Sequence, residues 1–143
     1  MPNMVSKVIK NLGISVHTAK PPTNEEWQEL ITLMQPSDVA NFRAISLTDG
    51  GAPNSAQRKS MNDYLAGRVP LSAVVTQSTV VRGVVTAMSW FNPNIKSFSP
   101  EELDAALVHL KVNRSEFALI KKEIRTLANS FGNVPMACIP KNL

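Results

Sequence analysis

Short apolar runs alternate with segments of helical periodicity along residues 14–112, and this alternation restricts the chain to a small set of folds. Four runs have strand character, at residues 14–18, 42–48, 71–76 and 95–98. A strand, a crossover helix and a second strand normally form a right-handed parallel unit. We therefore predict an α/β fold, with a single open, mostly parallel sheet of four to five strands and helices packed against it.

Helix signals separate these runs. Ser99, Pro100 and Glu102 combine a serine cap, a proline at the first helical position and a glutamate that completes a capping box. Residues 80–91 are rich in valine, which favours strands. Their polar residues nevertheless recur at helical spacing, so we predict a helix there, with Val84 and Met88 on its apolar face.

The chain divides into three parts by its pattern. We expect residues 1–13 to be an N-terminal extension, residues 14–112 to be the α/β domain, and residues 113–143 to be a C-terminal helix and tail. Apolar residues of that last helix repeat with a heptad-like period: Phe117, Ile120, Ile124, Leu127 and Phe131. This face can dock onto the sheet, or it can form the seam of a homodimer or of a contact with a partner.

Composition excludes several classes of protein. A length of 143 residues suits one domain, and the net charge of +4 comes from scattered basic residues, so no nucleic-acid surface is expected. One cysteine, Cys138, fits a reducing compartment. No signal peptide and no apolar run long enough to span a membrane is evident, which predicts a cytoplasmic protein. His17 and His109 have no ligand-spaced partners, so neither a metal nor a cofactor is expected.

The junction at residues 48–58 is the main candidate site. Paired glycines permit positive φ and close approach of a ligand, and the helix start that follows favours anions. Asp49 lies at the carboxyl end of a strand, where ligands gather in open α/β sheets. The candidate residues are Thr48, Asp49, Gly50, Gly51, Asn54, Ser55, Arg58 and, from the helix at 80–91, Arg82. The alternative is a tight turn whose polar groups satisfy only local backbone.

Residues 48–58 and 82–107 together resemble bacterial STAS-like (SpoIIAA-like) proteins. The similarity is carried by Thr-Asp-Gly-Gly-Ala-Pro-Asn-Ser-Ala-Gln-Arg and by the run from Arg82 through Trp90-Phe91 to Ala106-Leu107. It implies a STAS-like sheet and a role in partner switching or small-ligand binding. It also implies that Ser55, and secondly Thr48, occupy the place of the phosphorylated residue of STAS antagonists.

Three functions follow as hypotheses. The first is a non-enzymatic regulatory protein–protein interaction or small-anion-binding module of bacterial signalling, acting through the corner between Asp49 and Arg58. The second is a small hydrolase or transferase with Asp49 as base and Arg58 or Arg82 as anion clamp, which requires a deep pocket where these groups converge. The third is binding of a lipid-like ligand beneath the helix at 80–91, which requires an enclosed apolar cavity beside Val84 and Met88.

Overall fold

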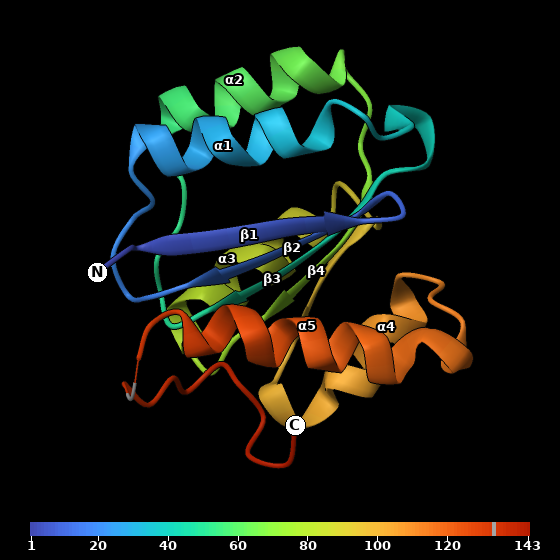
Figure 1. Cartoon of the computed structure of the whole chain (residues 1–143). Coiled ribbons are helices and arrows are strands. Elements are labelled where there is room, and N and C mark those ends of the chain that lie inside the picture. Colours follow the sequence, from blue (N-terminus) through green and yellow to red (C-terminus); the bar gives the residue numbers. More distant parts are fainter. Residues whose placement is uncertain (133) are drawn as a thin grey trace.

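A five-stranded sheet forms the centre of the molecule (Figure 1). The computed structural model describes residues 1–132 and 134–143, so residue 133 of the predicted tail lies outside the described part. Strand order follows the chain, and the strands are β1 (Met4–Ile9), β2 (Leu12–His17), β3 (Arg43–Thr48), β4 (Leu71–Val75) and β5 (Ile95–Phe98). β1 pairs antiparallel with β2, and all other pairs are parallel. The predicted α/β class with a mostly parallel sheet is confirmed.

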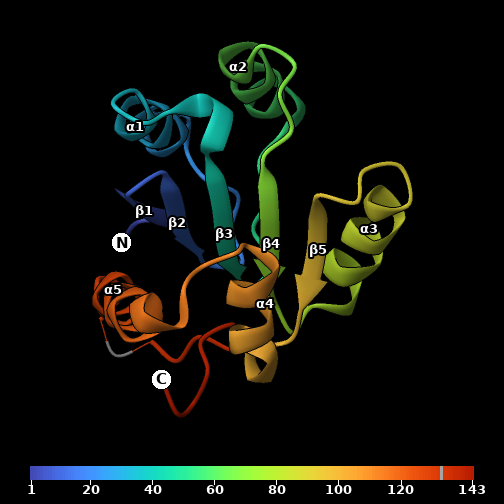
Figure 2. The same cartoon turned by 90° about the vertical axis from the view of Figure 1, so that its right-hand side faces the viewer.

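Helices lie on both sides of the sheet (Figure 2). The crossovers between parallel strands are α1 (Asn24–Met34), α2 (Ser55–Leu65) and α3 (Thr79–Ser89). α1 and α2 lie on one side, α3 lies beside β5 at the sheet edge, and the opposite side carries α4 (Leu103–His109) and α5 (Phe117–Asn129). Short 3-10 helices occur at Val39–Asn41, Pro100–Glu102 and Arg114–Glu116. No helix in the described residues is both long and apolar enough to cross a membrane.

The N-terminal residues belong to the sheet, which corrects the expectation of an extension at residues 1–13. β1 is joined to β2 by Lys10 and Asn11, with φ of 47° and 65°. Two consecutive residues with positive φ form the tight hairpin turn that matches strand twist. Such turns usually contain glycine, and Lys-Asn gave no such signal, so the hairpin was missed.

α5 docks on the sheet through the face that the heptad-like spacing defined. The side chains of Phe117, Ile120, Ile124 and Phe131 are buried in one cluster with the apolar side chains of β2, β3 and β4, and Leu127 packs against that cluster. Each buried side chain of this size stabilises the fold by roughly 1.5–3 kcal/mol. Because the sheet already covers this face, we do not propose a homodimer seam there.

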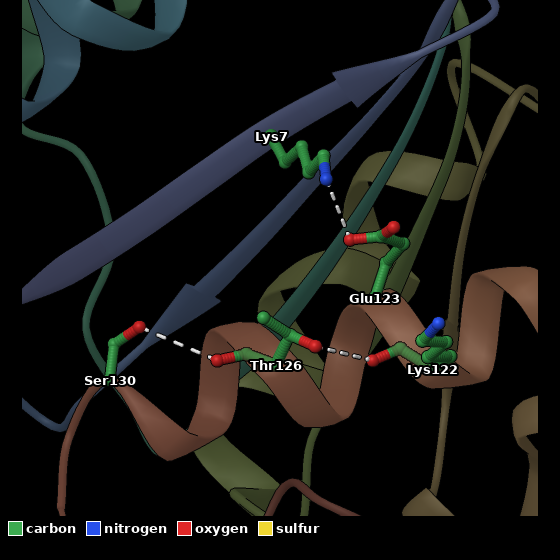
Figure 3. A network of polar contacts seen from close by, with 5 residues as sticks. All are labelled: Lys7, Lys122, Glu123, Thr126 and Ser130. Carbon is green, nitrogen blue, oxygen red and sulfur yellow. Dashed lines mark hydrogen bonds and ion pairs between the residues drawn. The ribbon is translucent and has the colours of Figure 1, made fainter.

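One polar contact also joins α5 to the sheet, and two others lie within the helix (Figure 3). Lys7 of β1 forms a 2.9 Å ion pair with Glu123. Two hydroxyls bond back along the helix, from Thr126 to the Lys122 carbonyl at 3.1 Å and from Ser130 to the Thr126 carbonyl at 3.5 Å. The ion pair joins the first strand, β1, to the last helix, α5.

Candidate functional site

Thr48 ends β3 and is buried. Its hydroxyl donates a 2.7 Å hydrogen bond to the Gly51 carbonyl and accepts one of 3.0 Å from the Gly50 N–H. Both hydrogen-bonding roles of the hydroxyl are therefore used inside the loop. The burial of this hydroxyl and its two hydrogen bonds disfavour access by a modifying enzyme, and phosphorylation at Thr48 stays a prediction.

The glycine pair serves the path of the backbone. Gly50 has φ of +135°, a conformation that L side chains rarely adopt. Gly51 donates its N–H to the Thr18 carbonyl at 2.9 Å, and a Cβ at this position would lie 2.1 Å from the Lys20 carbonyl oxygen. The glycines therefore allow the loop to pack closely against the segment that follows β2. This agrees with the tight-turn alternative, in which the loop serves local structure.

Asp49 holds the C-terminal tail. Its Oδ1 accepts a 2.8 Å hydrogen bond from the backbone N–H of Cys138. Burial, reinforced by the neighbouring Asp49 carboxylate, raises the pKa of the Cys138 thiol far above its usual range, so the thiol stays protonated and unreactive. One oxygen of the Asp49 carboxylate therefore has a structural role in holding the tail.

Asn54, one of the two residues at which the sequence allows a cap, is the N-cap of α2. Its Oδ1 accepts from the Gln57 N–H at 2.8 Å, and the Gln57 Oε1 accepts from the Asn54 N–H at 3.0 Å. The Gln57 amide then donates to the Pro22 carbonyl and to Asn24, each at 3.0 Å, which ties α2 to the start of α1. Sequence reasoning overlooked Gln57, although the Asn-x-x-Gln spacing of a capping box pointed to it.

Arg58 and Ser55 lie at the exposed start of α2. The Arg58 guanidinium donates to the Pro53 carbonyl at 2.8 Å and to the Ser55 hydroxyl at 3.1 Å. These bonds direct the guanidinium onto its own turn. Ser55 remains accessible, and its phosphorylation stays a prediction.

Arg82 does not join the corner. It is exposed on α3, and with Lys96 it contributes to holding the pKa of Glu102 below its usual value, after the larger effect of hydrogen bonds from Ser99. Asp49, Arg58 and Arg82 line none of the three cavities identified in the residues that the structure describes. The convergence that an enzyme would need is therefore not found in them.

α3 presents an apolar face to solvent, which corrects its expected orientation. Val84 and Met88, which were predicted to lie on the inward face, are 56% and 46% exposed. Their neighbour Val85 is buried. A second face is formed by residues at helical i, i+4, i+7, i+8 and i+11 spacing, here called the α3 stripe: Val80, Val84, Ala87, Met88 and Phe91. Val80 is 75% exposed and Phe91 is 90% exposed, and the adjoining Trp90 is 77% exposed. Sequence reasoning placed Trp90 and Phe91 in the core or at its rim.

Comparisons of the chain with family models, with curated proteins and with solved structures find no match.

Proposed function

We propose that the chain is a non-enzymatic regulatory module, of the bacterial signalling type that the STAS-like resemblance implies, and that it acts by protein–protein contact. The α3 stripe is its contact surface, in place of the corner between Asp49 and Arg58. The observation that carries this proposal is the exposure of five large apolar side chains together on one helix and the turn after it: Val80, Val84, Met88, Trp90 and Phe91.

The size of this surface supports an interface. Aromatic side chains carry roughly 150–250 Å² each, so Trp90 and Phe91 alone expose on the order of 300 Å². The valines and Met88 enlarge a patch that already reaches the 300–600 Å² roughly typical of the largest on a monomer. Large aromatic side chains and methionine are also the residues enriched in protein interfaces.

A second copy of the chain is the occupant that the stripe fits best. Most soluble oligomers are two-fold dimers, in which one patch contacts itself. The α3 stripe contains no charged residue, so two copies would bring no like charges together although the chain carries a net charge of +4. Two antiparallel α3 helices would pack their i, i+4 side chains ridge into groove.

Site-directed cross-linking tests this contact. Met88→Cys places a thiol in the α3 stripe, and Val108→Cys places one on α4 at a position that is 54% exposed. The native Cys138 is fully buried and should not react, so each variant offers one accessible thiol. We expect a short bismaleimide to give a covalent dimer with Met88→Cys and only modified monomer with Val108→Cys. Equal yields from both variants would contradict the proposal.

The other two hypotheses receive less support. The enzyme hypothesis needs a deep pocket where Asp49 converges with Arg58 or Arg82, and none of the three described cavities is lined by these residues. The hypothesis of a lipid-like ligand beneath α3 needs Val84 and Met88 to line an enclosed cavity, whereas both face solvent.

A further inference from the structure

A cavity of about 230 Å³ lies between the sheet and the helices α1 and α2. Its roof comes mainly from the two helices and is largely apolar, with Trp27, Leu30, Met34, Met61 and Leu65 beside the polar Asn62. Its floor is the sheet face that these helices cover, where the lining residues are Gly13, Ser15, His17, Ala44, Ser46 and Ser72. None of the α3 stripe residues lines this cavity. Its His17 adjoins the corner, because the His17 carbonyl accepts a 3.1 Å hydrogen bond from the Asp49 N–H.

The strand register places small side chains, several of them polar, next to one another on the floor of the cavity. Ser15 of β2 stands opposite Ser6 of β1 and Ser46 of β3, so three serines form one row across adjacent strands. In the next row, Gly13 stands opposite Ala44, and Ala44 opposite Ser72. Buried parallel strands normally carry large aliphatic residues on both faces. Here the residues are small, and the Phe42 ring packs over Gly13, where an added Cβ would lie 2.7 Å from its Cζ, so the open space lies over the neighbouring small residues.

His17 is larger than the other floor residues, and one of its ring nitrogens lacks a hydrogen-bond partner among the described residues. The residue is 4% exposed and lines the cavity, and its Nδ1 has no hydrogen-bond partner among the described residues. Burial lowers the pKa of His17 to about 4, although the nearby Glu26 carboxylate opposes this shift. The ring is therefore neutral near pH 7, with one nitrogen that donates and one that accepts. An unpartnered buried nitrogen costs about 1–3 kcal/mol.

We propose that this cavity binds a small uncharged molecule with a hydroxyl group and an apolar body, such as an alkylphenol. The hydroxyl pairs with the His17 ring and the serine floor, and the apolar body packs under Trp27 and Met34. A few well-placed polar groups in a mostly apolar pocket are the usual design of small-molecule sites.

The size and charge of the cavity define the ligand further. A cavity of 150 Å³ accommodates benzene. A volume of about 230 Å³ therefore suits a ligand of roughly nine non-hydrogen atoms. No lysine or arginine lines this cavity, so an anionic ligand would lose its hydration without a partner charge.

Calorimetric titration with two matched probes tests the proposal. 4-Methylphenol and 1,4-dimethylbenzene have nearly the same shape, and the phenol carries a hydroxyl where the hydrocarbon carries a methyl group. We expect the phenol to bind the full chain about 10-fold more tightly, because one hydrogen bond contributes roughly 1 kcal/mol and the unmet nitrogen gains a partner. Amide chemical shifts in ¹⁵N spectra should change at α1, α2 and β2, and the exposed Trp90 indole serves as the internal control.

Two variants separate the role of the histidine from the role of the space. His17→Phe removes the polar atoms and should abolish the preference for the phenol while 1,4-dimethylbenzene still binds. Ala44→Leu fills the floor and should abolish binding of both probes, with circular dichroism showing that each variant is folded. The proposal is overturned if neither probe binds the wild-type chain up to its solubility, or if the shifts cluster at Trp90. It is also overturned if folded His17→Phe keeps the preference for the phenol.

Discussion

The Asp49 carboxylate accepts a 2.8 Å hydrogen bond from the backbone N–H of Cys138, which lies 89 residues further along the chain. This contact joins the end of β3 to the tail that follows α5. It assigns to Asp49 a structural task at the place where ligands often gather in open α/β sheets. The candidate site is thereby divided into a structural corner and an exposed helix, α3.

We expect Asp49→Ala to lower the free energy of unfolding by about 2 kcal/mol, because the buried Cys138 N–H loses a charged acceptor. Urea unfolding measures this change. Asp63→Ala is the matched control, since Asp63 is exposed and pairs only with Lys59 on the same helix, and should cost less than about 0.5 kcal/mol. Equal losses in the two variants would show that the contact with Cys138 contributes nothing specific.

Gly51→Ala should destabilise the fold by about 2 kcal/mol or more, because its Cβ would lie 2.1 Å from the Lys20 carbonyl oxygen. Gly83→Ala should act in the opposite direction. Gly83 lies inside α3 with nothing within 4 Å of an added Cβ, so alanine should stabilise by roughly 0.5–1 kcal/mol. Melting temperatures of the two variants should therefore move apart on either side of the wild type. A tolerated Gly51→Ala would contradict the close packing described for the corner.

Stability should fall as the pH is lowered from about 6.5 towards 4, because of His17. The folded-state pKa of His17 is about 4, below the unfolded value of 6.5, so the unfolded chain binds the extra proton in this window. The stabilisation is fully present above pH 6.5 and decreases by up to about 1.4 kcal/mol per pH unit below it. Urea unfolding at a series of pH values should show this slope in the wild type. It should be much smaller in His17→Phe, and an unchanged slope would contradict the buried neutral ring.

Phosphorylation or Ser55→Asp should be tolerated and should stabilise α2 by roughly 0.3–1 kcal/mol, because a negative charge at a helix start is favourable. Arg58 already donates to the Ser55 hydroxyl and would pair with the added charge. Thermal unfolding of Ser55→Asp, alone and combined with Arg58→Gln, measures both effects. The gain should shrink in the double variant, and a loss of stability in Ser55→Asp alone would count against Ser55 as a modification site.

Local sequence signals predicted much of the fold. The capping pair Ser99 and Glu102 marks a helix start that the structure contains. Helical spacing correctly outweighed the strand preference of valine in α3, because polar residues recurred along it. The hairpin at Lys10 and Asn11 was missed because its positive φ values occur in residues without a glycine signal.

The site was harder to predict because its determinants are long-range. Asp49 meets Cys138 only through the position of the tail, which no local spacing encodes. The exposure of the α3 stripe depends on α3 lying at the sheet edge beside β5, so periodicity could identify an apolar face but not whether it is covered. The small residues of the cavity floor, apart from Gly13, were assigned to strands, but their alignment depends on the register between strands.

Sedimentation velocity over a range of protein concentrations tests the central claim most directly. The account predicts that the wild-type chain forms a dimer as concentration rises, and that Val84→Glu, at a position 56% exposed, remains a folded monomer. Val108→Glu, at a similarly exposed position on α4, should dimerise like the wild type. A wild type that stays monomeric at the highest concentration, or a Val84→Glu variant that dimerises as strongly as the Val108→Glu control, would contradict it.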